Sequence, residues 1–152
     1  MNCELEILPF APRHLDEAAR IEALCFSVPW SRAMLREEIE NPRACYLAAE
    51  EGGVLAGYAG LHAVLDEGYV TNVAVAPGFR RRGVASRLMA GLRAQAERRA
   101  LSFLTLEVRV SNHAAVALYE KYGFRPVGQR PGYYEKPKED ALIMTLNLMR
   151  NS

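Results

Sequence analysis

The stretch from Tyr69 to Gly91, YVTNVAVAPGFRRRGVASRLMAG, predicts a strand, a basic turn and a helix in direct succession. Its first part is rich in small and β-branched apolar residues, which are typical of a strand buried on both faces. Pro77-Gly78 ends this strand, because proline has no N–H for the sheet and glycine accepts turn dihedrals. From Val84 onward the apolar residues recur every three or four positions, which predicts an amphipathic helix.

The basic turn between this strand and helix is a candidate phosphate-binding site. The first N–H groups of a helix lack partners within the helix and lie at the positive end of its dipole, and small residues let an anion approach them. From Arg80 to Arg99 the net charge is +6 (seven arginines less one glutamate), against +1 for the whole chain. An arginine-rich, solvated helix start is the alternative interpretation. The candidate residues are Arg80, Arg81, Arg82, Gly83, Val84 and Ala85.

The turn also fits the pattern Q/R-x-x-G-x-G/A, with Arg80, Gly83 and Ala85 at the named positions, and it resembles the loop of the GCN5-related N-acetyltransferases (GNAT family). ALYEKYGF, residues 117–124, matches a second signature of that family. The resemblance covers nearly the whole chain and implies acetyl-coenzyme A as cosubstrate, with its pyrophosphate on the loop. The chain has neither the G-x-x-x-x-G-K-[ST] pattern of a nucleoside-triphosphate loop nor the G-x-G-x-x-G of a dinucleotide fold.

One branch of the family is matched in particular. LEVRVSNHAAVALYEKYGF (residues 106–124), GYYEKPKEDALIMTL (132–146) and Pro29-Trp30-Ser31 look like the ribosomal-protein-alanine N-acetyltransferases of the RimI type. Archaeal and eukaryotic acetyltransferases of protein N-termini are similar as well. The resemblance implies transfer to the N-terminal α-amine of a protein, with the alanine of a ribosomal protein as the expected acceptor. A small-molecule amine or a lysine side chain is the alternative acceptor, and a non-catalytic module that binds coenzyme A or nucleic acid is the alternative class.

Length and composition limit the other possibilities. A chain of 152 residues predicts one domain over residues 1–152. The near-neutral charge argues against a nucleic-acid partner, and no apolar run approaches the ~20 residues that span a bilayer. Cys3, Cys25 and Cys45 form no C-x-x-C motif, which favours reduced thiols in a cytoplasmic protein. The histidines show no paired metal spacing, so we expect no metal. The expected oligomeric state is a monomer or a weak dimer.

The order of elements predicts an α/β domain with a mixed sheet. Strands are expected at 4–8, 45–50, 54–65, 69–76, 101–110, 124–134 (interrupted at 131–132) and 141–149, and helices at 12–25, 32–40, from 84, and at 113–122. The family resemblance adds a fold with helices on both faces of the sheet. It also implies a splayed pair of strands, the central strand and the strand from Leu101, with a slot for pantetheine between them.

Glu107 is the candidate base. Strand alternation in LTLEVRV (residues 104–110) separates Glu107 and Arg109 from the apolar leucines and valines. Partial desolvation within such an apolar strand would raise the pKa of this carboxyl and suit it to accept a proton. An ion pair between Glu107 and Arg109 on a solvated edge is the alternative. The family resemblance favours Glu107 as a base that acts through water, in a direct transfer without an acyl-enzyme.

Tyr119 is the candidate acid, which the resemblance makes the donor that protonates the coenzyme A thiolate. Plain packing of its ring is the alternative, and both can hold because a tyrosine can bury its ring and present its hydroxyl. The resemblance also makes Asn112 a cofactor contact, beside its expected role as a helix N-cap. It assigns the acetyl oxygen to a backbone N–H near Val75, with Val73 facing the substrate side.

Three aromatic residues are candidates for acceptor binding. Trp30 lies in a loop between two predicted helices, where it either plugs the core or walls a substrate groove. Tyr133 and Tyr134 resemble the tyrosines that line the peptide groove of the family. Their alternative is a plain structural role as β residues near a turn.

Overall fold

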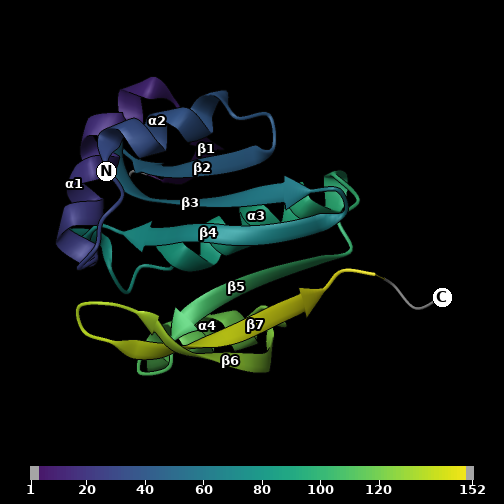
Figure 1. The fold of residues 1–152 in the computed structure, drawn as a ribbon. Helices are drawn as coiled ribbons and strands as arrows, with labels where there is room; N and C mark the ends of the chain where they lie inside the picture. The colour runs from purple at the N-terminus through teal and green to yellow at the C-terminus, as the bar shows by residue number, and fades with distance from the viewer. Residues whose placement is uncertain (1–3, 150–152) are drawn as a thin grey trace.

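The computed structural model describes residues 4–149, and its centre is one seven-stranded sheet (Figure 1). The strands are β1 (Leu5–Pro9), β2 (Ala44–Glu51), β3 (Val54–Val64), β4 (Glu67–Val75), β5 (Phe103–Arg109), β6 (Arg125–Tyr134) and β7 (Glu139–Asn147). Their order across the sheet is β1-β2-β3-β4-β5-β7-β6. Neighbouring strands are antiparallel except β4 and β5, which are parallel. The predicted α/β class and mixed sheet are confirmed.

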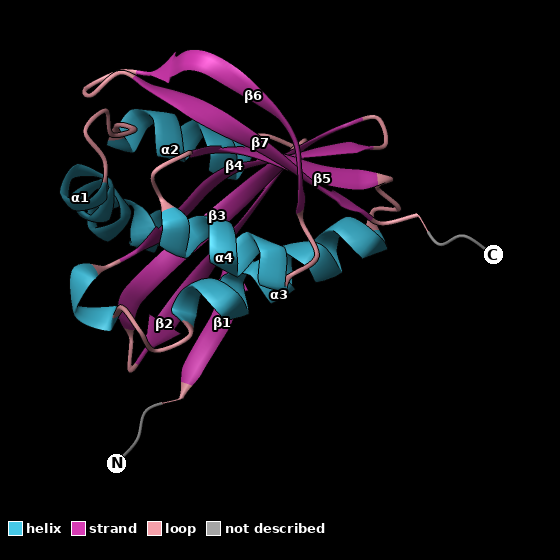
Figure 2. Ribbon diagram, turned by 90° about the horizontal axis from the view of Figure 1, so that it is seen from below, coloured by secondary structure: helices cyan, strands magenta, loops and turns pink. Residues whose placement is uncertain are grey.

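Helices cover both faces of this sheet, as predicted. They are α1 (Leu15–Cys25), α2 (Arg32–Glu40), α3 (Val84–Arg98) and α4 (His113–Lys121), with short 3₁₀ turns at η1 (Pro12–His14) and η2 (Pro77–Phe79). The helices α1 and α2 share one cluster of buried side chains with the sheet, and α3 and α4 share another on the opposite face (Figure 2). The described helices include none long and apolar enough to cross a membrane.

Side chains and glycines at the helix ends follow the sequence signals. The Ser31 hydroxyl accepts a hydrogen bond from the Met34 N–H and caps α2, and the Asn112 amide accepts one from the Ala115 N–H and caps α4. Gly123, with φ of +96°, lies just beyond α4. The predicted start of the first helix at Pro12 is corrected. Residues 12–14 form a 3₁₀ turn, in which the Ala11 N–H donates to His14 Nδ1 before α1 begins.

The parallel pair β4 and β5 separates after a short contact, which confirms the predicted splay. Only Glu67–Tyr69 of β4 pair with Phe103–Thr105 of β5. Beyond Tyr69, β4 stays paired with β3 as far as Val75, while β5 stays paired with β7 as far as Arg109. Figure 1 shows the two strands close together at one end and spread apart at the end where their arrowheads lie. A gap therefore opens in the middle of the sheet.

The burial of β4 differs from the prediction. We expected this strand to be buried on both faces, but only one of its two sets of side chains is covered by protein. Asn72 and Ala74 are buried, whereas the alternating Val73 and Val75 are only half-buried. The apolar residues of this second set face the gap between the strands, because β5 has already turned away.

Two further expectations fall on described residues. The predicted interruption of the strand at 131–132 corresponds to a shift in the β6–β7 register between Arg130 and Tyr134, although the strand itself continues. Cys25 and Cys45 are free, half-buried thiols, and burial raises the pKa of Cys45. Cys3 lies outside the described residues.

Tyr119 on α4 belongs to the core. Its ring lies 5.8 Å from that of Phe124, and its residue is 8% exposed. Burial raises the pKa of Tyr119 to about 12. A phenol whose pKa is higher in the folded than in the unfolded chain favours folding below pH 10, and this contribution is lost as the pH rises from about 10 to about 12.

We therefore expect Tyr119→Phe to lose less stability at alkaline pH than the unmodified chain. The free energy of unfolding should fall by about 1 kcal/mol less between pH 9 and pH 11 in this variant than in the unmodified chain. Urea unfolding at the two pH values measures the difference. Tyr122→Phe, at the C-cap of the same helix, is the control, and equal slopes for all three proteins would contradict the assigned pKa.

Candidate functional site

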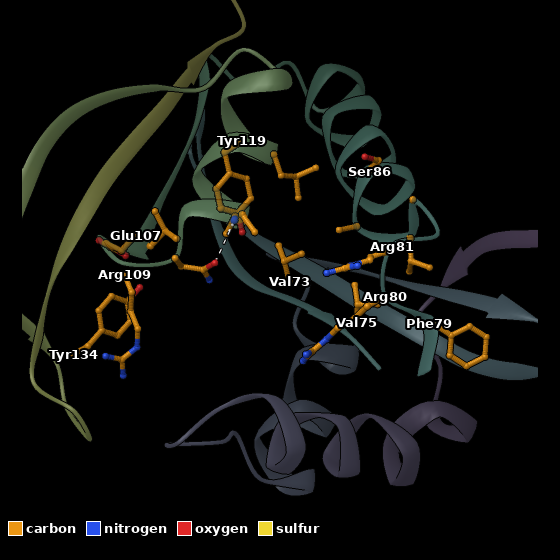
Figure 3. A pocket seen from close by; sticks show the side chains of 18 residues that line it. Val73, Val75, Phe79, Arg80, Arg81, Ser86, Glu107, Arg109, Tyr119 and Tyr134 are labelled. Carbon is orange, nitrogen blue, oxygen red and sulfur yellow. Dashed lines mark hydrogen bonds between the residues drawn. The ribbon is translucent and has the colours of Figure 1, made fainter. Parts of the chain in front are cut away.

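A large cavity occupies the gap between β4 and β5. It has a volume of about 730 Å³, and we call it the basic cavity because three arginines line it against one glutamate. Its lining residues are Val73, Val75, Phe79, Arg80, Arg81, Gly83, Val84, Ala85, Ser86, Glu107, Val108, Arg109, Asn112, Ala114, Ala115, Leu118, Tyr119 and Tyr134. Figure 3 shows Glu107, Arg109 and Tyr134 on one side, Arg80, Arg81 and Ser86 on the other, and Val73 and Tyr119 between them.

The loop before α3 presents unpaired helix N–H groups to the basic cavity. Gly83 is the N-cap, so no side chain caps the helix, and its first turn contains no acidic residue. Gly83 has a φ of +76° and Arg81 a φ of +65°, both in the left-handed region. A Cβ at Gly83 would meet no protein atom within 4 Å, so glycine is favoured here by its dihedral alone and the space in front of the helix is open. Such a helix start is suited to an anion.

The arginines of the predicted turn have different surroundings. Arg80 and Arg81 line the basic cavity. Arg82 does not: its guanidinium lies 2.8 Å from Glu51 and 5.4 Å from the ring centroid of Phe79. Of the predicted phosphate-binding residues, the structure therefore brings all but Arg82 to one cavity.

Glu107 lies in the wall of the basic cavity and also in that of a second cavity. Its side chain is 31% exposed, and its Oε1 lies 3.5 Å from Arg130 Nε. The alternative pair with Arg109 is not formed. Arg109 instead lies 3.3 Å from Glu139 and donates to the carbonyls of Glu135 and Pro137. Both arginines thus anchor the hairpin between β6 and β7 to the strand that carries Glu107.

Tyr119, Asn112, Val73 and Val75 all line the basic cavity, as the sequence analysis placed them together. The Tyr119 ring packs in the core while the residue still lines the cavity, so packing of the ring leaves the predicted role as an acid open. Asn112 caps α4 and lines the cavity as well. The Val75 carbonyl accepts a weak hydrogen bond from the Cys25 thiol, which links this wall to the end of α1.

The second cavity, of about 370 Å³, adjoins the first. We call it the acidic cavity, because two carboxylates line it and none of the described residues in its wall is basic. Its lining residues are Glu22, Phe26, Val28, Trp30, Tyr69, Val70, Thr71, Asn72, Thr105, Glu107, Tyr133 and Tyr134. The three predicted acceptor-binding aromatics, Trp30, Tyr133 and Tyr134, therefore meet in one place.

The two tyrosines are held by arginines. The rings of Tyr133 and Tyr134 pack edge to face, with centroids 5.0 Å apart. Arg130 lies over Tyr133 at 5.7 Å and Arg109 over Tyr134 at 4.5 Å. Burial raises the pKa of Tyr134 to about 12, and its neighbours Tyr133 and Glu107 act in the same direction. Tyr134 and Glu107 belong to both cavities, so they mark the point where the contents of the two would meet.

Glu22 is a site residue that the sequence analysis did not single out. It is 1% exposed on α1, yet its carboxylate reaches the acidic cavity. It accepts hydrogen bonds from the Trp30 N–H at 2.8 Å, the Asn72 amide at 3.4 Å and the Tyr58 hydroxyl. The signal for it was present: a glutamate on the apolar stripe of an amphipathic helix is costly unless it is paired.

No metal-binding group is seen in the described part of the chain. Across residues 4–149, no three or more His, Cys, Asp and Glu side chains gather where they could hold a metal ion.

Comparison with known proteins gives this geometry a family. Residues 15–124 match the model of the acetyltransferase (GNAT) family. The [ribosomal protein bS18]-alanine N-acetyltransferase of Escherichia coli (strain K12) is 37% identical over 134 residues, which is 87% of this chain and 90% of that protein. The crystal structure of the ribosomal-protein-S18-alanine N-acetyltransferase from Escherichia coli superposes with a TM-score of 0.90 at 33% identity, covering 98% of this chain and 97% of that one.

A more distant structure shares the fold alone. Arabidopsis thaliana NAA60, crystallised in complex with acetyl-CoA, superposes with a TM-score of 0.87 at 18% identity and covers 95% of this chain and 99% of its own. The family match, the similarity to the Escherichia coli protein and the splayed sheet agree. The chain belongs to the GNAT family of acetyltransferases and is an N-acetyltransferase.

Proposed function

We propose that this enzyme transfers the acetyl group of acetyl-CoA to the N-terminal α-amine of a protein, with the N-terminal alanine of a ribosomal protein as the acceptor. The observation that carries the proposal is the division of charge: a basic cavity and an acidic cavity meet at Glu107 and Tyr134. The relatives named ribosomal protein bS18-alanine N-acetyltransferases support this acceptor. A ribosomal protein acceptor agrees with the predicted cytoplasmic location.

The basic cavity suits the cosubstrate. Acetyl-CoA carries anionic phosphates at one end and a thioester at the other, joined by a long and largely uncharged arm. The open N-terminus of α3, with Arg80 and Arg81 beside it, suits the phosphates. The apolar side chains of Val73 and Val75 suit the arm, which would direct the thioester toward Glu107 and Tyr134 at the far side.

The acidic cavity suits an amine. An ammonium group approaching the thioester from this side meets the carboxylates of Glu22 and Glu107 and no competing cation among the described lining residues. An α-ammonium has an ordinary pKa near 8, so only a modest base is needed to remove its proton at neutral pH. The aromatic rings of Trp30, Tyr133 and Tyr134 supply apolar walls for the first residues of a peptide.

Two residues divide the proton transfers in this proposal. Glu107 accepts a proton of the ammonium through a water molecule, which leaves the neutral amine to attack the acetyl carbonyl. The new C–N bond forms, the C–S bond breaks, and the Tyr119 hydroxyl donates its proton to the departing thiolate. The nitrogen loses its second proton to water as it becomes an amide, and a proton from water restores the Tyr119 hydroxyl. Tyr119 is protonated at neutral pH, as a phenol ordinarily is, and burial raises its pKa further. A backbone N–H near Val75 polarises the carbonyl, as in an oxyanion hole. Acetyl-CoA itself supplies the activated acetyl group.

Peptide acetylation followed by mass spectrometry tests the acceptor. The panel contains peptides that differ only in their first residue, alanine included, and a peptide with a blocked N-terminus and an internal lysine. We expect one acetyl group on the free alanine terminus and none on the blocked peptide. Acetylation of lysine alone would instead make a lysine side chain the acceptor. Acetylation of no peptide, despite binding of acetyl-CoA, would make a small-molecule amine the acceptor.

Removal of either proton-transfer group should slow turnover without loss of the cosubstrate. Glu107→Gln and Tyr119→Phe should each lower kcat by about 100-fold, because general acid–base catalysis contributes about that much. Calorimetry should show acetyl-CoA bound as before. Glu120→Gln on α4 and Tyr122→Phe at its C-cap, both outside the two cavities, are the matched controls. Near-normal turnover in both test variants would overturn the assignment.

A charge introduced at the start of α3 should block the cosubstrate. Gly83→Glu places a carboxylate beside the helix N-terminus and forces a side chain into the left-handed region, so the Kd for acetyl-CoA should rise by about tenfold or more. Gly78→Glu is the matched control. It adds the same charge to the same loop, where a Cβ meets open space and the φ is ordinary. Equal affinities of the two variants by calorimetry would refute this location of the phosphates.

A further inference from the structure

Tyr46 reaches across one strand of the sheet to contact the next. Tyr46 on β2 is opposite Gly60 on β3, and Gly60 is opposite Asn72 on β4, so the three residues form one row across three strands. The Tyr46 hydroxyl donates to Asn72 Oδ1 at 2.8 Å and lies 2.6 Å from Thr71 Oγ1. A side chain of β2 is thus bonded to β4, although the two strands are not neighbours.

Gly60 makes this reach possible. A Cβ at this position would lie 2.3 Å from Tyr46 Cζ and 2.4 Å from both Cε atoms, closer than any real Cβ contact. The aromatic ring therefore lies flat over the glycine backbone, and any other residue at position 60 would displace it. Tyr46 itself is 7% exposed, so its hydroxyl has little access to water.

The hydroxyl contacts β4 where its regular pairing is interrupted. Gly60 pairs with Asn72 and Leu61 pairs with Val70, which leaves Thr71 as an extra, bulged residue on β4. The two residues that Tyr46 contacts are this bulged residue and the next one. Thr71 also bonds the Gly60 carbonyl at 3.3 Å, and Asn72 extends the chain of hydrogen bonds to Glu22. Burial raises the pKa of the Tyr46 hydroxyl, which is in any case protonated at neutral pH.

The bulge lies between the two cavities. The last contact of β4 with β5 is at Tyr69, two residues before the bulge. Thr71 and Asn72 line the acidic cavity, whereas Val73 and Val75 line the basic cavity. The conformation of Thr71 and Asn72 therefore decides how the wall of one cavity is placed relative to the wall of the other.

We propose that Tyr46, seated on Gly60, is a positioning residue for acetyl transfer: its hydroxyl holds the β4 bulge so that the acceptor amine and the thioester meet in register. This proposal rests on the proposed function in one respect, the identity of the acceptor. Tyr46 lines neither cavity, so it acts through Thr71 and Asn72. β5 does not pair with β4 at the bulge, so the Tyr46 hydroxyl holds the Thr71 and Asn72 side chains where that neighbouring strand is absent.

Tyr46→Phe tests the proposal, because it keeps the ring on Gly60 and removes only the hydroxyl. Leu35→Val is the matched control: it trims a fully buried residue of the same core cluster that lines neither cavity. We expect faster hydrogen exchange of the backbone amides at residues 71–75 in Tyr46→Phe and no such change in Leu35→Val. The kcat for peptide acetylation should fall by about tenfold in Tyr46→Phe alone, while the Kd for acetyl-CoA stays within about twofold.

The outcomes separate the two proposals. Wild-type exchange at residues 71–75 in Tyr46→Phe, or a kcat within about twofold of the wild type, would overturn the positioning role. If kcat falls equally in Tyr46→Phe and Leu35→Val, the effect of Tyr46 is one of core packing alone, and the positioning role is overturned as well. The exchange measurement needs no acceptor. If the unmodified enzyme acetylates no peptide, the proposed acceptor fails, and hydrogen exchange still decides whether Tyr46 holds the bulge.

Gly60→Ala provides a second, independent variant. It keeps the hydroxyl but pushes the ring away from β4, so it should reproduce both the faster exchange and the lower kcat of Tyr46→Phe. Wild-type behaviour of Gly60→Ala in both measurements would show that the ring does not need this seat, and would contradict the proposal.

Discussion

The early separation of β4 from β5 is the constraint on which the site depends. Two adjacent parallel strands ordinarily continue side by side, because each supplies hydrogen-bond partners for the other. Here three residue pairs hold them, after which β3 retains β4 and β7 retains β5. The sheet stays continuous at one end and opens at the other. Both cavities, and every candidate residue for binding and chemistry apart from Arg82, lie along that opening.

Most of the fold was predictable from local signals. Ser31 and Asn112 cap their helices, and the change of apolar period after Gly83 marks the start of α3. The splay itself came from the family resemblance. The predicted burial of β4 on both faces was wrong for a physical reason. Apolar residues at positions 73 and 75 indicate that this face of the strand avoids water. They do not distinguish a face covered by protein from one that lines a cavity.

The site was predictable in its members but not in its pairings. Alternation along β5 places Glu107 and Arg109 on the same face, yet their ionic partners, Arg130 and Glu139, come from strands that are distant in sequence. No local pattern states which strand lies beside β5. Glu22 shows the reverse case. Its place on an apolar helix stripe was visible, but its partners Tyr58 and Asn72 are supplied by β3 and β4.

The grip of Arg109 on the hairpin between β6 and β7 has a mechanical consequence. One guanidinium bonds two carbonyls and a carboxylate of that hairpin and also covers the Tyr134 ring. The hairpin side of the acidic cavity therefore moves with β5 or not at all. The opposite rim, formed by Phe26, Val28 and Trp30, is tied to Glu22 by two hydrogen bonds, from the Trp30 N–H to its carboxylate and from the Phe26 N–H to its carbonyl. If the acidic cavity takes the proposed amine, the connection between α1 and α2 is thus the side with fewer ties to the sheet, and the β6–β7 side is the more firmly held wall.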